Sequence, residues 1–382
     1  MTDNPSFEQH QMRVTAKAVD LAATRIRAQG RELPRIILST HVEAKLAGWA
    51  LILRDAGFGV CVSPSNPAST MPDAADQLRA QGVAVLDHDP AKPPSADYVR
   101  AVTDFAPDLV LDDGALLIRD FMTSGTQLPQ LRGAVEFTTS GHDLLEMSSE
   151  VTAPVLDVGV SYCKYELGNI YGTGVSALAA LCSTVNVHLG AKRVLVVGYG
   201  AVGRSVAMAA RSLGASVSVA DNKVRNLARA HFDGHEVGAL PELIGSSDIV
   251  FTCSGAVGVM TAELMTALPD QAIVANVGCF ASEIDVEGLR RRAVETQRHE
   301  RQIETFELED GRHVHVLADA ELVNLALGRG WPIELIDLTF ALSTLCFAEL
   351  CTTDLPAGLH RVSTRLDEEA LQLFFDTRTA HP

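Results

Sequence analysis

The feature that most limits the fold is an apolar run that leads directly into a glycine-rich turn. Residues 194–197 read Val-Leu-Val-Val, and Gly198, Gly200 and Gly203 follow in the pattern GxGxxG. The apolar run predicts a buried parallel strand, and the stretch after the turn predicts a helix. In such a turn the first glycine permits the tight bend, the second lets a pyrophosphate approach the backbone, and the third lets helix and strand pack closely. The predicted dinucleotide-binding residues of this turn are Gly198, Gly200, Ala201, Val202 and Gly203.

An acidic residue after the next apolar run indicates which dinucleotide the turn binds. Asp221 closes the segment ASVSVAD, eighteen residues after Gly203. A carboxylate in this place accepts hydrogen bonds from the ribose hydroxyls and repels a 2′-phosphate, which favours NAD over NADP. Lys223 and Arg225 follow closely and oppose that preference. The alternative is a glycine-rich turn in an α/β domain that binds no nucleotide. We predict that NAD is the cofactor.

Length and charge exclude several classes of protein. The 382 residues suffice for two domains with cores of their own, and the net charge of −17 argues against nucleic acid or a membrane surface as a partner. We therefore expect a small-molecule substrate. The polar N-terminus and the lack of a long apolar run predict neither a signal peptide nor a membrane span. The seven cysteines are scattered without zinc spacing, so we expect reduced thiols in the cytoplasm and no metal site.

Strand and helix patterns alternate along most of the chain. They predict an α/β protein with two doubly wound parallel-sheet domains, the second a Rossmann domain, and a cleft between them. We place a substrate and catalytic domain at residues 1–170, completed by 333–382, and an NAD-binding domain at 171–332. The apolar helix predicted after residue 333 is interrupted by acidic residues, so we expect it to pack on the first domain. The proline-rich stretch 65–74 is expected to be a surface loop. The expected strands are 35–40, 57–63, 82–87 and 108–113 in the first domain, and RVLVVG, SVSVAD, DIVFTCS, AIVANVG and HVHVLA in the second.

Polar residues gather where the predicted strands end. They occur at 39–41, 112–113, 252–254 and 276–279. Any one of them alone is equally well explained as a cap or turn residue. In parallel sheets, however, ligands bind outside the carboxyl ends of the strands, and the joint placement favours a ligand site.

Several longer segments resemble the signature segments of the S-adenosylhomocysteine hydrolase family. They are GNIYGTGVSALAAL with the glycine turn, AIVANVGCFASEIDVEGL, LADAELVNLALGRGWP, LDDGALLI, EFTTSG and LPAGLHRVSTRLDEEAL, and together they cover about residues 35–370. The resemblance implies that bound NAD takes hydride from the 3′ carbon of an adenine nucleoside. The ketone acidifies the C4′ hydrogen, a base removes it, the C5′ substituent leaves, and the hydride returns. NAD is then recycled within each turnover.

The resemblance assigns roles to residues in both predicted domains. Lys164 falls where the family has a lysine beside the 3′-hydroxyl, and burial makes a lysine a plausible base at neutral pH; the alternative is a solvated surface lysine. Asp113 matches the second acid of Asp-Asp-Gly, and Glu43 matches the acid at the adenine end. Ser254, at a predicted strand end, is added to the NAD side. The NAD-side positions that the resemblance implies are Thr138, Thr139, Ser140, Asn169, Asn226, Asn276 and Asn324.

Four positions depart from the family pattern. Phe137 stands where the family has a second glutamate, and Gly168 stands where it has an aspartate. Both lost carboxylates would face the ribose, so the sugar hydroxyls or ring substituents of the substrate are expected to differ. Cys279 and Trp331 replace two family histidines. We predict that Phe137 and Cys279 contact the substrate.

The histidine of the first predicted strand end is displaced. The family segment Leu-His-Met-Thr-Val-Glu reads Leu-Ser-Thr-His-Val-Glu at residues 38–43, which moves the histidine two positions to His41. His41 either reaches the C5′ side or takes the place of an adenine-side threonine. The remaining alternative is a strand-end histidine with a purely structural hydrogen bond.

These departures favour a specialised reaction at C5′. Our leading hypothesis is loss of water from a 5′-hydroxyl to give a 4′,5′-unsaturated nucleoside, a lyase (dehydratase) step that suits nucleoside-antibiotic biosynthesis. Hydroxide is a poor leaving group, so a general acid is needed, and His41 oriented by Asp113 is the candidate. The alternatives are a genuine S-adenosylhomocysteine hydrolase and a catalytically silent NAD-binding regulator. A 2-hydroxyacid dehydrogenase would need an Arg with a Glu/His pair, of which we find no convincing set.

The family's long C-terminal tail, which carries a lysine and a tyrosine into the cofactor site of a neighbouring subunit, has no counterpart in this sequence. We therefore expect a homo-oligomer, either a dimer or the usual tetramer with the dimer favoured, in which NAD is held less tightly.

Overall fold

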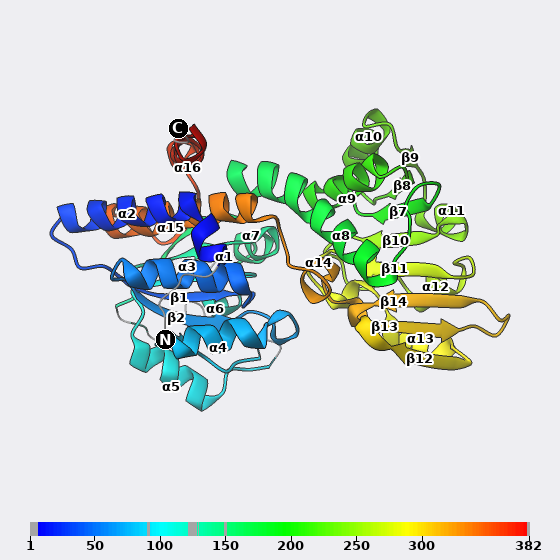
Figure 1. Ribbon diagram of the computed structural model, residues 1–382, viewed down its shortest axis with the longest axis horizontal. Helices are drawn as coiled ribbons and strands as arrows, with labels where there is room; N and C mark the ends of the chain where they lie inside the picture. Colours follow the sequence, from blue (N-terminus) through cyan, green and yellow to red (C-terminus); the bar gives the residue numbers. More distant parts are fainter. Residues whose placement is uncertain (1–6, 90–91, 121–127, 129, 149–150, 380–382) are drawn as a thin grey trace. The chain divides into compact units, whose positions relative to one another are not determined.

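The computed structural model describes residues 7–89, 92–120, 128, 130–148 and 151–379, and the chain divides into two compact units, each built around its own sheet (Figure 1). Unit 1 comprises Met1–Glu166 and Ile333–Pro382, and unit 2 comprises Leu167–Pro332. The α/β class with a doubly wound sheet in each part of the chain is confirmed.

The sheet of unit 1 has seven parallel strands in the order β15-β6-β5-β4-β1-β2-β3. Successive strands run outward on one side of β1 and then continue on its other side with β4. The carboxyl ends of β1 and β4 therefore flank the topological switch point, where doubly wound sheets bind ligands. The strands are β1 Arg35–Thr40, β2 Gly59–Pro64, β3 Ala84–Val85, β4 Leu109–Asp112, β5 Gly133–Glu136, β6 Pro154–Asp157 and β15 Gly358–Arg361.

The helices of unit 1 come from both ends of the chain. Helix α15 lies along α2 (Figure 1), and the Asp337 carboxylate on α15 accepts hydrogen bonds from the backbone N–H groups of Val14 (3.0 Å) and Thr15 (2.7 Å). These two N–H groups lie in the first turn of α2 and have no partner within that helix. The helices are α1 Phe7–Gln11, α2 Arg13–Ala28, α3 Ala44–Asp55, α4 Pro72–Ala80, α5 Ala96–Phe105, α6 Leu116–Ile118, α7 Thr139–Glu146, α15 Ile333–Thr352 and α16 Thr364–Thr379.

Helix α15 forms part of the core of unit 1. Trp49 of α3 stacks on Phe340 with ring centroids 4.2 Å apart, and its indole N–H donates to Thr344 Oγ1 at 3.1 Å. By length and composition α15 is apolar enough to cross a membrane, but 83% of its most apolar window is buried inside the protein. That burial is typical of a core helix.

The sheet of unit 2 has eight strands in the order β12-β13-β14-β11-β10-β7-β8-β9. It differs from the expected parallel sheet at one edge, where β12, β13 and β14 pair antiparallel. All five residues of β12 are exposed, so this strand carries no apolar pattern. The strands are β7 Arg193–Val197, β8 Ser216–Ala220, β9 Glu236–Val237, β10 Ile249–Thr252, β11 Ala272–Asn276, β12 Glu295–His299, β13 Ile303–Glu307 and β14 His313–Leu317.

Strand β7 explains why residues 194–197 form an unbroken apolar run. Val194 and Val196 belong to one hydrophobic cluster, and Leu195 and Val197 belong to another. Alternate side chains point to opposite faces, so a strand buried on both faces needs apolar residues at every position. A π-type helical segment, Tyr162–Thr173, precedes the helices of unit 2, which are α8 Gly174–Val185, α9 Ala201–Ser212, α10 Val224–Phe232, α11 Leu240–Leu243, α12 Ala262–Thr266, α13 Val286–Arg292 and α14 Val323–Ala326.

Candidate active site

Two of the predicted catalytic residues meet at the switch point of the unit 1 sheet. Ser39 of β1 pairs with Asp112 of β4, which places the residues that follow them side by side. His41 Nε2 lies 3.7 Å from Asp113 Oδ2, and Thr40 Oγ1 donates a hydrogen bond to the same carboxylate oxygen at 2.8 Å. The side chains of His41 and Asp113 are 20% and 13% exposed, so both are shielded yet accessible to a ligand.

The orientation of His41 is set by Ser69 and not, as expected, by Asp113. Ser69 Oγ donates its proton to the Asn66 carbonyl at 3.0 Å and lies 2.5 Å from His41 Nδ1. A hydroxyl has one proton, so when Ser69 Oγ gives it to the Asn66 carbonyl, the Nδ1–H of the imidazole is the donor to Ser69 Oγ. In the neutral ring Nε2 is then free of a proton, and in the imidazolium ion it carries one toward Asp113. At 3.7 Å Asp113 makes no hydrogen bond to the ring, and its role is electrostatic.

Glu43, predicted to lie at the purine end, is the N-cap of α3. Its Oε1 accepts from the Leu46 N–H at 3.2 Å, and its Oε2 forms an ion pair with Lys45 Nζ at 2.8 Å. Both side chains are buried. The sequence reasoning missed Lys45, which offers a cation beside the carboxylate and therefore neutralises it.

Lys164 is nearly buried, which rules out the solvated surface lysine. Its Nζ lies over the ring of Phe137 at 4.4 Å from the ring centroid, and its backbone N–H donates to Ser161 Oγ at 3.2 Å. Phe137 is itself buried and packs on Phe340 of α15. An aromatic face attracts an ammonium ion without supplying a negative charge.

A row of buried carboxylates crosses the same edge of the sheet. Asp112, Glu136 and Asp157 are the last residues of β4, β5 and β6 and stand in register. Burial raises the pKa of Asp112 to about 7, and the charge of Asp113 adds to that rise. Burial also raises the pKa of Glu136 well above its usual range, and the charges of Asp112 and Asp113 raise it further. His142 Nδ1 lies 2.6 Å from Asp157 Oδ2. The sequence reasoning missed Glu136, Asp157 and His142, because an acid at the end of a short strand reads as a turn residue.

Glu136 organises two segments that the resemblance assigned to the site. Its carboxylate accepts from the N–H groups of Gly114 (3.1 Å) and Ala115 (2.9 Å), in the turn after Asp113. It also accepts from the N–H and the hydroxyl of Thr138, both at 2.8 Å. This one side chain ties the Asp113 turn to the start of α7.

The predicted NAD-side hydroxyls of unit 1 all make internal hydrogen bonds. Thr138 caps α7 by accepting from the Gly141 N–H at 3.0 Å and lies 3.0 Å from Ser140 Oγ. Thr139 donates to the Gly159 carbonyl at 3.3 Å. Their contacts with a cofactor remain a prediction.

The glycine turn of unit 2 has the geometry that a dinucleotide needs. Gly198 has φ +96°, and a Cβ there would lie 2.8 Å from the Cys253 carbonyl. A Cβ at Gly203 would collide with the Gly198 carbonyl, while nothing lies within 4 Å of one at Gly200. Ala201 begins α9, so its N-terminal N–H groups face the open side of the turn.

Asp221 is held in place at the end of β8. Its Oδ2 accepts from the Tyr199 N–H (2.6 Å) and from Asn226 Nδ2 (3.0 Å), and its Oδ1 accepts from the Lys223 N–H (2.7 Å). A lone pair of Oδ1 remains for a ribose hydroxyl. Asn226 thus positions the acid.

Asn276 and Ser254 are loop organisers at the carboxyl ends of β11 and β10. Asn276 Nδ2 donates to the carbonyls of Gly278, Phe280 and Ala320, and Thr252 donates to its Oδ1. Ser254 donates through its N–H (2.9 Å) and its hydroxyl (2.8 Å) to Glu283, a buried acid that the sequence reasoning missed. Burial raises the pKa of Glu283.

The remaining predicted residues of unit 2 differ in exposure. Asn169 is half-buried and Cys279 is exposed. Asn324 is buried, and its Oδ1 has no hydrogen-bond partner in the described part of the chain. A buried acceptor without a donor is rare and costly, so it fits a position that a ligand amide completes. The space beside the Gly200 backbone can take a pyrophosphate, and the Asn324 oxygen can accept from an amide of the ligand. The residues of unit 2 therefore fit NAD.

Two departures from the family pattern form one contact. A Cβ at Gly168 would collide with the indole of Trp331, whose Nε1–H donates to Thr173 Oγ1 at 2.9 Å. The indole therefore occupies the space that an acidic side chain at position 168 would need. Loss of the aspartate and replacement of the histidine are physically linked.

Comparison with known proteins agrees with this geometry. Residues 169–330 match the S-adenosyl-L-homocysteine hydrolase, NAD binding domain. Over 349 residues the chain is 34% identical to an adenosylhomocysteinase of Thermotoga maritima, covering 89% of this chain and 86% of that protein. Over 345 residues it is 34% identical to an S-inosyl-L-homocysteine hydrolase of Methanosarcina mazei, covering 89% and 84%. The chain is therefore an NAD-dependent enzyme that belongs to the S-adenosyl-L-homocysteine hydrolase (adenosylhomocysteinase) family.

Proposed function

We propose that this enzyme removes water from C5′ of a purine nucleoside, by transient oxidation at C3′ and deprotonation at C4′. The supporting observation is the environment of His41, whose Nδ1 is fixed by Ser69 and whose Nε2 faces Asp113. A hydroxyl leaves only if it is protonated as the C–O bond breaks, so the reaction needs a general acid near C5′. An imidazolium ion stabilised by a nearby carboxylate is such an acid.

The chain's other residues have complementary roles in this proposal. Lys164 accepts the proton of the 3′-hydroxyl, releases it to solvent and then accepts the C4′ proton; one proton returns to the 3′ oxygen with the hydride and the other restores His41. The position of Lys164 over Phe137 leaves the site without a second acid at residue 137. Bound NAD supplies the hydride acceptor at C3′ and returns the hydride at the end. His41 gives its proton to the departing oxygen. The products are water and a 4′,5′-unsaturated nucleoside, as in a biosynthetic pathway to a nucleoside antibiotic.

A second candidate is hydrolysis of an S-nucleosyl-homocysteine thioether. It is favoured by the 34% identity to hydrolases of this family and by the presence of Lys164 and Asp113. It is disfavoured by Phe137 and by the pairing of Gly168 with Trp331, which remove acidic groups from the positions that the family uses. The relatives are named for both adenosyl and inosyl substrates, so the purine base is a separate question. Glu43 beside Lys45 offers an acceptor and a donor.

One experiment separates these functions. The NAD-loaded enzyme is incubated in D₂O with adenosine, inosine and their S-homocysteine thioethers, and the products are followed by chromatography and mass spectrometry. We expect water loss from a free nucleoside, and deuterium at C4′ of the substrate that is recovered unreacted. Release of homocysteine alone would support the hydrolase instead. Neither product nor exchange would contradict both and indicate a silent NAD-binding regulator.

Two variants complete this test. Lys164→Ala is expected to abolish exchange, while Lys17→Ala, which removes an exposed lysine of α2 in the same unit, is expected to leave it unchanged. The predicted dimer and the cytoplasmic location remain proposals, and light scattering of the NAD-loaded protein tests the first of them.

A further inference from the structure

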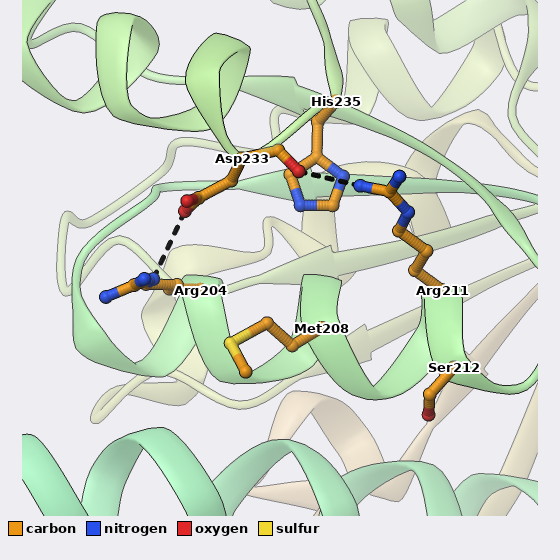
Figure 2. Close-up of a pocket in the computed structure, with 6 residues that line it drawn as sticks. All are labelled: Arg204, Met208, Arg211, Ser212, Asp233 and His235. Atoms are coloured by element: carbon orange, nitrogen blue, oxygen red, sulfur yellow. Dashed lines mark hydrogen bonds and ion pairs between the residues drawn. The ribbon is translucent and has the colours of Figure 1, made fainter.

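A hollow with cationic walls lies along α9 in unit 2, the helix that begins in the glycine turn. Its volume is about 390 Å³. Arg204 and Arg211 stand seven residues apart on α9, which places them on one face of that helix, two turns from each other. Figure 2 shows both side chains directed toward the segment between α10 and β9. The lining residues are Arg204, Met208, Arg211, Ser212, Asp233 and His235.

The acidic residue in this hollow is already compensated. Asp233 Oδ2 accepts from Arg204 Nε at 3.1 Å and from the Tyr199 hydroxyl at 2.9 Å. Arg211 Nη1 donates to the backbone carbonyl of Asp233 at 2.6 Å. Each guanidinium carries five N–H donors, so both retain donors beyond these bonds. The lining residues include two arginines and one aspartate, so the hollow has a positive net charge although the net charge of the protein is −17.

His235 adds a polar ring to the lining of the hollow. It is 6% exposed and meets the ring of Tyr199 edge to face, with the ring centroids 5.8 Å apart. Burial lowers the pKa of His235, and Arg211 lowers it further, so at neutral pH the ring carries one N–H donor. This donor adds to those of the two arginines that line the same hollow.

We propose that this hollow binds a small doubly charged oxyanion, with Arg204 and Arg211 holding its oxygens. The planar guanidinium matches the geometry of phosphate and carboxylate groups and binds them through paired N–H donors. The volume falls in the range of small-molecule sites and exceeds what an inorganic ion fills. Met208 supplies an apolar wall for the organic part. The same chemistry is carried by a phosphate monoester and by a dicarboxylate, and the experiment distinguishes them.

The test is isothermal titration of the NAD-loaded protein at constant ionic strength with inorganic phosphate, glycerol 3-phosphate and succinate. These probes lack a nucleoside and the reaction plays no part, so the result is independent of the proposed function. We expect saturable binding, with glycerol 3-phosphate tighter than inorganic phosphate. Binding of succinate as tight as that of glycerol 3-phosphate would assign the site to dicarboxylates, and weaker binding would assign it to phosphate esters.

Two arginine variants locate the binding. Arg211→Gln removes an exposed guanidinium of the hollow and is expected to weaken binding about tenfold, the loss of one charge-assisted pair. Arg292→Gln makes the same charge change at an exposed residue of α13 and is expected to bind as the unchanged protein does. The proposal is overturned if no probe binds, or if Arg211→Gln binds as tightly as Arg292→Gln.

Discussion

The ammonium group of Lys164 lies over the face of the Phe137 ring, 4.4 Å from its centroid. Family resemblance places a glutamate at position 137, so an aromatic quadrupole stands where a full negative charge is expected. Both groups attract an ammonium ion, but the ring does so more weakly and holds no proton.

Phe137→Glu is expected to slow the enzyme at neutral pH and to move the rising limb of the kcat profile to higher pH by about one unit. The reason is that a new carboxylate near Lys164 favours the protonated amine, which is inactive as a base. The measurement is kcat from pH 6 to 10. Phe137→Leu, which removes the ring without adding charge, is the control, and an equal shift in both variants would contradict the electrostatic explanation.

Ser69→Ala is expected to lower kcat about tenfold with little change in KM. It removes the oxygen that accepts from His41 Nδ1, so the ring is free to rotate away from the leaving group. Ser69→Thr keeps the hydroxyl and should retain activity. The matched control is Thr70→Ala, because Thr70 also donates to the Asn66 carbonyl but does not contact His41. A comparable loss in Thr70→Ala would assign the effect to the loop.

Asp112→Asn is expected to flatten the pH dependence of stability. In the folded protein the pKa of Asp112 is raised to about 7, above its value in the unfolded chain. The protonated carboxyl group therefore stabilises the folded protein at low pH. Its contribution declines as pH rises from about 4 to 7, by on the order of 4 kcal/mol at most. The asparagine does not ionise, so the free energy of unfolding of the variant should fall less over this interval than that of the unchanged protein. Urea unfolding followed by circular dichroism checks this, with the exposed Asp104→Asn as the control; parallel curves for all three proteins would refute it.

Gly168→Asp is expected to destabilise the protein by about 1–3 kcal/mol, because its side chain would collide with the Trp331 indole. The double variant with Trp331→His restores the pair that the family resemblance implies and should recover most of that loss. A double-mutant cycle on the free energy of unfolding measures the coupling. Additive effects of the two substitutions on the free energy of unfolding would show that residues 168 and 331 are not energetically coupled.

Gly200→Ala is expected to weaken NAD binding at least tenfold while leaving the stability of the NAD-free protein unchanged. Nothing in the protein lies within 4 Å of a Cβ at this position, so the methyl group obstructs only a bound pyrophosphate. Calorimetry of NAD binding and thermal unfolding provide the two readouts. Gly245→Ala, where the nearest atom is 3.7 Å away, is the control, and equal NAD affinities would argue against the turn as the cofactor site.

The strands that the sequence predicted best are those buried on both faces, such as β1 and β7, where every buried residue is apolar or small. Strands β5 and β6 were missed because each has four residues and ends in a buried acid, which resembles a turn. Strand β12 was missed because its side chains are all exposed. The spacing of apolar residues indicates which residues are buried, so it cannot identify a strand that is short or exposed to solvent.

Site residues at strand ends were predictable because parallel strands align their carboxyl ends. Their partners were not. Ser69 is 28 positions from His41 in the sequence, and Glu283 is 29 positions from Ser254. Such contacts arise from loop geometry, which no local pattern encodes. The stretch 65–74 had been expected to be only a surface loop, yet it carries the anchor of the histidine.

The clasp between Asp337 and the start of α2 has a consequence for how the chain folds as it is synthesised. The N–H groups of Val14 and Thr15 cannot form their hydrogen bonds until Asp337 has been synthesised. Unit 2, in contrast, consists of one continuous segment, Leu167–Pro332. Domains generally fold as units during translation. We therefore expect the nucleotide-binding unit to be complete first, while unit 1 stays open until its segment from Ile333 onward has been synthesised.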